Sequence, residues 1–278
     1  MFLNGAFVAA EEARVSVFDR GFLLGYGAFE TMRAYRGRVF RLAQHLERLN
    51  RTCAALGIPF TADAARLKPT IGALLARNGL ADARVRLTVT AGPEEERLPY
   101  NPTILLAAFP LRDSTAVPAW RAYLWQGAVS SQDPLRAHKT TSYLEKVLAR
   151  REAERNGFDE ALFVNEKGNV TEGAATNIFC VRAGRLLTPP TAEGLLPGIT
   201  RAVVAELAER TGIPFLEQPL TPGDIVRSDE AFLSNSVVEI VPLVAVGYIP
   251  VGTGTPGPLT ARLRVSYREL VRQELGLN

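Results

Sequence analysis

The sequence predicts a two-domain protein of mixed α+β and α/β character, with a small N-terminal α/β domain and a larger strand-rich domain. Two patterns indicate this. Up to residue 110, apolar side chains alternate between strand spacing and helical spacing, whereas from residue 161 onward short apolar runs are separated by tight turns. We expect the small domain over 1–120, an interdomain connection over 121–134 and the large domain over 135–278.

Apolar periodicity defines the elements of the small domain. Residues 29–35 and 85–89 alternate as strands, and 103–109 form a more uniformly apolar strand. In the first of these, Phe29, Thr31, Arg33 and Tyr35 share one face. Residues 42–56 and 67–75 carry apolar side chains at helical spacing, and a glycine follows each run closely.

In the large domain, the same patterns predict three helices and several short strands. The helices cover 142–155, 199–211 and 258–275, and the strands include 161–164, 177–181 and 231–234. In the helix over 142–155, we expect Leu144, Val147 and Leu148 to point inward.

Composition excludes several classes of protein. A net charge of +3 with scattered arginines gives no support for a nucleic-acid partner. We find no signal peptide and no apolar run long enough to span a membrane, so no membrane partner is expected. Two isolated cysteines indicate a reducing, cytoplasmic compartment, and two distant histidines argue against a metal site.

Two segments carry groups suited to carbonyl and ring chemistry. Lys139 precedes a predicted helix, where a lysine is usually a solvated charge; burial would lower its pKa and free the amine to attack a carbonyl. Glu172 begins a run of glycine and alanine that would let a flat ring approach closely, although an exposed turn carboxylate is the simpler interpretation.

Two further segments could bind an anion. The turn Pro197-Gly198 opens a helix whose first amides are available to an anion, and the hydroxyl of Thr200 lies beside them. Ser234 and Ser236 flank an asparagine after a predicted strand. Arg48 adds a cation, with a helix-surface arginine as the alternative. Taken singly, each of these signals also fits an ordinary turn or helix start.

In this order along the chain, the segments resemble the class IV (fold-type IV) pyridoxal-phosphate aminotransferases. The group includes branched-chain and D-amino-acid aminotransferases, (R)-selective amine transaminases and 4-amino-4-deoxychorismate lyases. The resemblance covers nearly the whole chain, through the motifs Asp19-Arg20-Gly21, Gly27-Ala28-Phe29-Glu30, His45-Leu46-Glu47-Arg48-Leu49, Lys139, Thr171-Glu172-Gly173, Asn177-Ile178-Phe179 and Leu196-Pro197-Gly198-Ile199-Thr200-Arg201. It implies the two-domain fold of that family, with a pseudo-barrel as its larger domain, and pyridoxal 5'-phosphate as cofactor.

The resemblance also implies roles for individual residues. Lys139 corresponds to the lysine that bonds to the cofactor and moves the substrate proton, and Glu172 to the carboxylate beside the ring nitrogen. The remaining cofactor contacts that it implies are Arg48, Tyr143, Asn177, Leu196, Ile199, Thr200, Ser236 and Val237.

Resemblance leaves the substrate open. The chain lacks the paired cations of one D-amino-acid group, since 90–100 offer only Arg97, and Leu24 stands where branched-chain enzymes carry a tyrosine. We expect a small amino acid or amine as donor, either a D-amino acid or (R)-amine or a branched-chain L-amino acid, with pyruvate or 2-oxoglutarate as acceptor. Candidate substrate contacts are Arg33, Tyr35, Arg97, Tyr100 and Trp125.

Two alternatives remain at this point. The first is a 4-amino-4-deoxychorismate lyase, which would release pyruvate and 4-aminobenzoate, and the short N-terminus resembles that group. The second is a non-catalytic, cofactor-binding paralogue. The resemblance further implies a homodimer.

Overall fold

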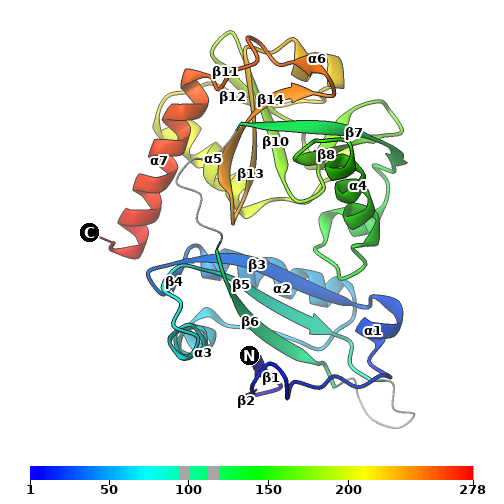
Figure 1. The fold of residues 1–278 in the computed structure, drawn as a ribbon, viewed down its shortest axis with the longest axis vertical. Helices are drawn as coiled ribbons and strands as arrows, with labels where there is room; N and C mark the ends of the chain where they lie inside the picture. The colour runs from blue at the N-terminus through cyan, green and yellow to red at the C-terminus, as the bar shows by residue number, and fades with distance from the viewer. Residues whose placement is uncertain (94–100, 112–118, 278) are drawn as a thin grey trace. The chain divides into compact units, whose positions relative to one another are not determined.

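A computed structural model describes residues 1–93, 101–111 and 119–277, which form two compact units (Figure 1). The first unit comprises Met1–Asp113, His138–Tyr143 and Leu277. The second comprises Ser114–Ala137 and Leu144–Gly276. The short segment that carries Lys139 therefore groups with the first unit, although the sequence before and after it belongs to the second.

The first unit contains a six-stranded sheet in the order β2-β1-β6-β5-β3-β4, and every pairing in it is antiparallel. Its elements are β1 (Phe2–Leu3), β2 (Ala6–Phe7), α1 (Arg20–Leu24), β3 (Gly27–Tyr35), β4 (Arg38–Val39), α2 (Leu42–Ala55), α3 (Ala64–Arg77), β5 (Ala83–Thr90) and β6 (Ile104–Pro110). Since α2 and α3 follow each other between β4 and β5, this unit is α+β in its detailed topology.

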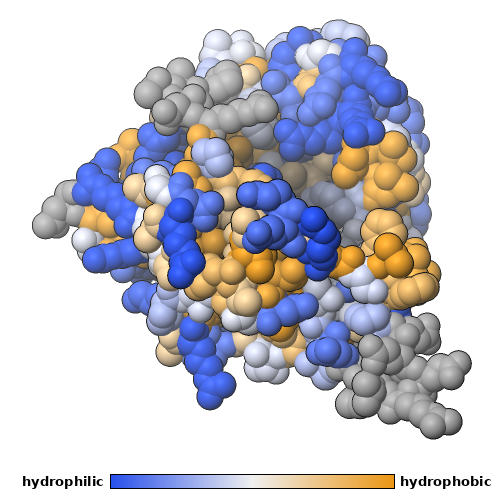
Figure 2. Space-filling view, turned by 60° about the horizontal axis from the view of Figure 1, so that its bottom comes forward, coloured by the Kyte–Doolittle hydropathy of each residue, from blue (hydrophilic) through white to orange (hydrophobic). Residues whose placement is uncertain are grey.

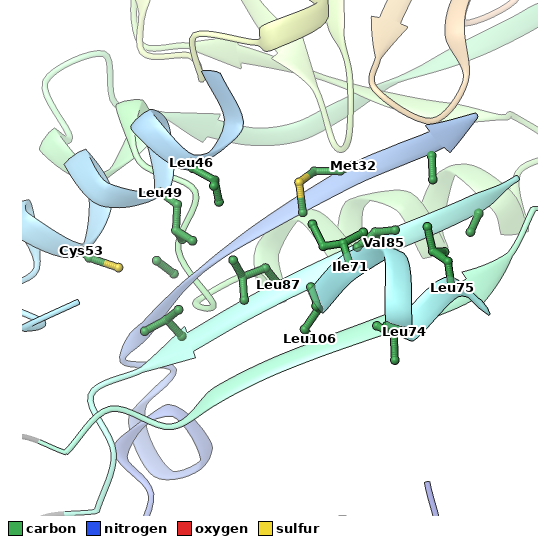
Figure 3. Packing of buried hydrophobic residues seen from close by; sticks show 14 of the residues in the cluster. Met32, Leu46, Leu49, Cys53, Ile71, Leu74, Leu75, Val85, Leu87 and Leu106 are labelled. Atoms are coloured by element: carbon green, nitrogen blue, oxygen red, sulfur yellow. The ribbon is translucent and has the colours of Figure 1, made fainter. Parts of the chain in front are cut away.

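Helices α2 and α3 pack on one face of this sheet (Figure 3). The buried side chains come from β3, β5 and β6 on the sheet side and from the two helices on the other. Those labelled in Figure 3 are Met32, Leu46, Leu49, Cys53, Ile71, Leu74, Leu75, Val85, Leu87 and Leu106. Helical spacing of the leucines and period-two spacing of the strands each bring one apolar stripe to this core, as the sequence predicts.

The second face of the sheet, opposite α2 and α3, carries the other set of β3 side chains. These are Phe29, Thr31, Arg33 and Tyr35, the set predicted to share a face. The segment 138–143 pairs with the start of β3. Phe29 donates its backbone N–H to the carbonyl of Lys139 at 2.9 Å, and Thr141 donates to Gly27 at 2.8 Å. This pairing fixes the backbone of Lys139 beside the sheet.

The second unit contains a curled nine-stranded mixed sheet in the order β12-β11-β10-β13-β14-β7-β8-β9, with β15 paired to β14 (Figure 1). Its strands are β7 (Trp120–Val129), β8 (Glu160–Asn165), β9 (Val170–Gly173), β10 (Asn177–Arg182), β11 (Arg185–Thr188), β12 (Phe215–Glu217), β13 (Glu230–Asn235), β14 (Glu239–Val246) and β15 (Ile249–Pro250). Its α-helices are α4 (Leu144–Arg155), α5 (Ile199–Arg210), α6 (Pro222–Val226) and α7 (Pro258–Leu275), with short 3₁₀ turns at Pro134–Ala137 and Thr191–Glu193.

Two details differ from the sequence predictions. Residues 121–134, expected as a connection, include most of β7, which pairs in parallel with β8 and β14. Helix α4 buries Ala149 and Ala153, whereas Leu144, Val147 and Leu148 are 68%, 38% and 48% exposed. Close packing of α4 on the sheet needs small side chains, so its bulky residues lie outward in the single chain. Within the described residues, no helix is long and apolar enough to cross a membrane.

Candidate active site

In the first unit, the Lys139 amine lies against two aromatic rings on the second face of the sheet. Its Nζ is 4.6 Å from the centre of the Phe29 ring and 5.8 Å from that of Tyr143. The two rings meet edge to face at 5.4 Å. Lys139 is half-buried and not the freely solvated charge of its simpler interpretation. The backbone pairing with β3 and the two rings together hold the amine in a defined place.

Arg86 on β5 is a functional candidate that the sequence did not reveal. Its guanidinium carbon lies 3.7 Å from the centre of the Phe29 ring. Burial, and then the neighbouring guanidinium of Arg84, lower the pKa of Arg86. A cation that is partly removed from water in this way gains from a negatively charged ligand. The available signal is the alternation of two arginines with buried apolar residues in the strand Ala83–Thr90.

Of the predicted substrate contacts, Arg33 and Tyr35 also lie on this second face. The Arg33 guanidinium stacks over the Tyr35 ring at 4.6 Å. Trp125 lies on β7 in the second unit and packs against a small cluster that includes Phe163, with the two ring centres 6.4 Å apart. Arg97 and Tyr100 lie outside the described residues. All of these contacts remain predictions.

A buried cluster of charged groups lies between β3 and α2 in the first unit. Arg48 donates from Nε to Glu30 Oε1 at 2.7 Å and from Nη2 to Oε2 at 2.8 Å, while His45 Nδ1 lies 2.7 Å from Oε2. Glu30, His45 and Arg48 are all at most 4% exposed. Arg48 is therefore a buried, oriented cation, and not a helix-surface arginine.

The ionisation of this cluster follows from its contacts. Burial alone would raise the pKa of Glu30, but the charges of Arg48 and His45 and their hydrogen bonds outweigh it and lower that pKa to about 2. Burial lowers the pKa of His45 against the opposing effect of Glu30, and Arg48 and Lys139 lower it further. At neutral pH the cluster therefore contains a carboxylate, a guanidinium and a neutral imidazole.

In the second unit, Glu172 on β9 presents a carboxylate held at both oxygens. Lys146 of α4 donates to Oε1 at 2.6 Å, and the backbone N–H of Leu196 donates to Oε2 at 3.1 Å. Glu172 is only 4% exposed. Buried carboxylates are stable only when they are paired or hydrogen-bonded, and these two contacts meet that need. The exposed-turn interpretation of Glu172 is therefore wrong.

The turn before α5 is built around the side chain of Asn177, which lies close against its backbone. Asn177 donates from its side-chain amide to the carbonyl of Leu196 at 2.9 Å. A Cβ on Gly198 would lie 1.9 Å from Asn177 Oδ1, so the turn requires glycine there. Because Gly198 is also the N-cap, no side chain caps α5, which begins with Ile199 and the buried Thr200. This helix start keeps the character of an anion site.

The β13–β14 turn lies at the end of the strand that pairs with Asn177. The side-chain oxygen of Asn235 accepts the backbone N–H groups of Val237 and Val238, each at 2.8 Å. Ser234, directly opposite Asn177 in the pairing, has a buried hydroxyl with no hydrogen-bond partner among the described residues. A buried hydroxyl left in this way can be satisfied by a polar group of a ligand.

These observations fit an anionic cofactor with a basic ring. The second unit contains the hydrogen-bonded carboxylate of Glu172, the start of α5 and the Ser234 hydroxyl, for which the described part of the chain offers no partner. The first unit contains the Lys139 amine and the buried Arg48. Of the residues predicted for the cofactor, the first unit contains Lys139, Tyr143 and Arg48, and the second contains Glu172, Asn177, Leu196, Ile199, Thr200, Ser236 and Val237.

The two-domain fold carries the groups predicted for an enzyme that binds an anionic cofactor. The family model described as amino-transferase class IV matches residues 27–246. The chain therefore belongs to the class IV aminotransferases, and the predicted resemblance and two-domain fold are confirmed.

Relatives of this chain are named for more than one activity. It is 37% identical to the putative branched-chain-amino-acid aminotransferase of Methanocaldococcus jannaschii, over 97% of this chain and 96% of that one. It is 30% identical to the aminodeoxychorismate lyase of Bacillus subtilis, over 98% and 94%. The crystal structure of the branched-chain aminotransferase from Thermoproteus uzoniensis with norvaline matches with a TM-score of 0.89 and 33% identity, covering 100% of this chain and 95% of that one.

Proposed function

We propose that this aminotransferase uses pyridoxal 5'-phosphate to move an amino group from a branched-chain L-amino acid to 2-oxoglutarate. The observation that carries the proposal is the carboxylate of Glu172, buried and held at both oxygens in the second unit. A fixed carboxylate favours the protonated form of a pyridine nitrogen, and the positive ring then withdraws electrons from the substrate α-carbon. When bound, the cofactor supplies two things: an aldehyde, which condenses with amines, and this electron-withdrawing ring.

Lys139 is proposed to bond to the cofactor and to move the substrate α-proton. Its amine lies against Phe29 and Tyr143, and this placement restricts the directions from which it can reach a proton. The phosphate is proposed to bind at the start of α5, through the amides of Ile199 and Thr200, with Ser236 and the Arg48 guanidinium as further donors.

The second face of the first unit's sheet supplies groups that suit an amino acid with an apolar side chain. Arg33 and Arg86 are among the cations there, and either would pair with a carboxylate. Phe29, Tyr35 and Tyr143 offer aromatic surface for a hydrocarbon side chain. The putative branched-chain-amino-acid aminotransferase of Methanocaldococcus jannaschii, similar over nearly the full length, supports this choice of donor.

A donor screen tests this function. We expect L-leucine, L-isoleucine and L-valine with 2-oxoglutarate to give kcat/KM values at least about tenfold above those of D-alanine and (R)-1-phenylethylamine with pyruvate, a difference of about 1.4 kcal/mol in transition-state binding. Glutamate formation, measured with a coupled dehydrogenase, gives the rate. A preference for D-alanine or for the (R)-amine would contradict the proposed substrate but retain the transaminase.

A second function keeps the same cofactor and lysine. The lyase of Bacillus subtilis is similar over 98% of this chain, so release of pyruvate from 4-amino-4-deoxychorismate is the alternative. Formation of 4-aminobenzoate, together with no transfer from any donor in the screen, would establish the lyase.

We also propose that the chain forms a homodimer in the cytoplasm. Helix α4 exposes Leu144, Val147 and Leu148 at helical spacing, and Figure 2 shows apolar areas open to the surface between hydrophilic side chains. Such a stripe is typical of a surface that a second copy covers. Both cysteines are free and buried, which supports a reducing compartment.

Substitution of Leu148 by glutamate tests the dimer. We expect the dimer dissociation constant to rise at least about hundredfold, because the interface would have to bury an unpaired carboxylate. Light scattering after size exclusion, over a range of concentrations, measures this change. Val265→Glu is the matched control, since Val265 is also an exposed apolar residue, on α7. A parent protein that is monomeric at all concentrations would contradict the proposal.

A further inference from the structure

The ion pair between Lys146 and Glu172 differs from the other charged contacts of α4. Its nitrogen and oxygen are 2.6 Å apart, and the side chains are 17% and 5% exposed. One turn further on, Arg150 and Glu154 form a pair with side chains 50% and 56% exposed. Surface pairs of that kind contribute little, whereas removing charges from water is costly and needs good compensation. The buried pair therefore calls for a specific role.

The contacts of Glu172 show what Lys146 contributes. Leu196 reaches one carboxylate oxygen through a backbone N–H, and Lys146 reaches the other through its ammonium group. With both oxygens occupied, the carboxylate cannot rotate freely about its terminal bond. A carboxylate has about four acceptor positions, so these two donors leave about two positions open, one of which can accept a ring N–H.

Alternative donors do not explain this arrangement. The backbone amide of Leu196 alone would satisfy one oxygen and leave the plane of the group undefined. Glu145, next to Lys146 in sequence, is an acceptor and not a donor, and it is paired with Arg136 at 2.7 Å. Within the described part of the second unit, Lys146 is the side chain that forms an ion pair with Glu172.

We propose that Lys146 is a positioning residue, which holds the Glu172 carboxylate in the orientation that accepts the N–H of a protonated pyridine-type ring. This inference rests on the proposed function, because it assumes that Glu172 contacts the ring nitrogen. Lys146 itself need not touch the cofactor. Its contribution is to order the Glu172 carboxylate before the ring binds, so that less conformational entropy is lost on binding.

The consequence is a selective effect on ligands that carry the ring nitrogen. Without the ammonium group, the carboxylate must be ordered by the ligand itself, so the affinity for a ring N–H falls. A ligand of the same shape that lacks the nitrogen gains nothing from an oriented carboxylate. Its affinity should therefore not depend on Lys146.

Binding to the apoenzyme tests the proposal without use of activity. The apoenzymes of the parent, Lys146→Met and Lys146→Arg are titrated with pyridoxal 5'-phosphate and with its 1-deaza analogue, in which a carbon replaces the ring nitrogen. For Lys146→Met we expect about tenfold weaker binding of pyridoxal 5'-phosphate, and a change of less than about twofold for the analogue. Lys146→Arg, which keeps the charge and a donor, should return the affinity to within about threefold of the parent.

Controls separate this effect from a general loss of structure. Arg151→Met removes an exposed cation from the same helix and should bind both ligands like the parent. Glu172→Gln should lose the preference for the nitrogen-containing ring. Should Lys146→Met fail to fold, judged by circular dichroism, Lys146→Gln replaces it in the same titrations.

Three outcomes overturn the inference. Lys146→Met binding both ligands like the parent means that Lys146 has no positioning role. Equal weakening of both ligands means that its role is structural only. A parent apoenzyme that binds neither ligand contradicts the proposed function itself, and the inference fails with it. In the first two outcomes the parent binds pyridoxal 5'-phosphate, so the two kinds of failure can be told apart.

Discussion

Replacement of Lys139 by alanine is expected to lower the rate of amino transfer by about a thousandfold or more. Proton transfer by a positioned side chain contributes about 10² to 10⁴ in rate, and here the same amine is also proposed to bond to the cofactor. The methyl group of alanine can do neither. The rate of glutamate formation from L-leucine and 2-oxoglutarate, measured at saturating cofactor, checks the expectation.

A matched variant shows whether the effect belongs to the amine. Lys68 is an exposed lysine on α3, and Lys68→Ala should retain the parent rate. Lys139→Arg keeps a cation beside Phe29 and Tyr143, but its guanidinium stays protonated and offers no free amine to bond to an aldehyde or to take a proton, so it should be as inactive as the alanine variant. Turnover of Lys139→Ala at the parent rate would exclude the proposed role.

The sequence predicted most elements because their burial patterns are local. The alternation in 29–35 identified both β3 and its face, and α7 begins and ends at the predicted residues, Pro258 and Leu275. Each depends on apolar side chains that recur at one spacing and face one core. In the candidate site, motifs in fixed order identified the family, and the structure then showed that Arg48 and Glu172 are buried.

Other features could not be predicted, because they depend on partners far apart in the chain. The apolar spacing in α4 defines a stripe but not the surface that covers it, so Leu144 and Leu148 were placed inward. Glu30 lies within an apolar strand, and its contact with Arg48 requires the packing of β3 on α2. The pairing of Lys146 with Glu172 likewise joins α4 to β9. A single sequence contains no signal for such pairs.

Substitution of Glu30 by glutamine is expected to have the largest effect on stability. It would leave the Arg48 guanidinium buried without its counter-charge, which typically costs about 3–5 kcal/mol of the free energy of unfolding. Urea denaturation at pH 7, followed by circular dichroism, measures the loss. Glu47→Gln, an exposed acid on the same helix as Arg48, should change the free energy by less than about 0.5 kcal/mol.

The pH dependence of this effect has a defined sign. The pKa of Glu30 is lowered from 4.5 to about 2, so the unfolded chain binds the proton more readily than the folded one. Its stabilising contribution, about 3 kcal/mol by this shift, is complete above pH 4.5 and is lost as the pH falls toward 2. The difference between the parent and Glu30→Gln should therefore narrow across that range.

A double substitution separates the role of the Glu30–Arg48 ion pair in stability from the role of the Arg48 guanidinium in cofactor binding. In Glu30→Gln with Arg48→Met, no unpaired buried charge remains, so part of the lost stability should return, while pyridoxal 5'-phosphate binding should stay weak without the guanidinium. The two measurements then diverge, because folding requires that the charges cancel whereas the phosphate requires the cation itself. If the affinity for the cofactor instead recovered together with stability in the double variant, Arg48 would act only as a structural residue, and the phosphate would have to be held by the start of α5 and Ser236 alone.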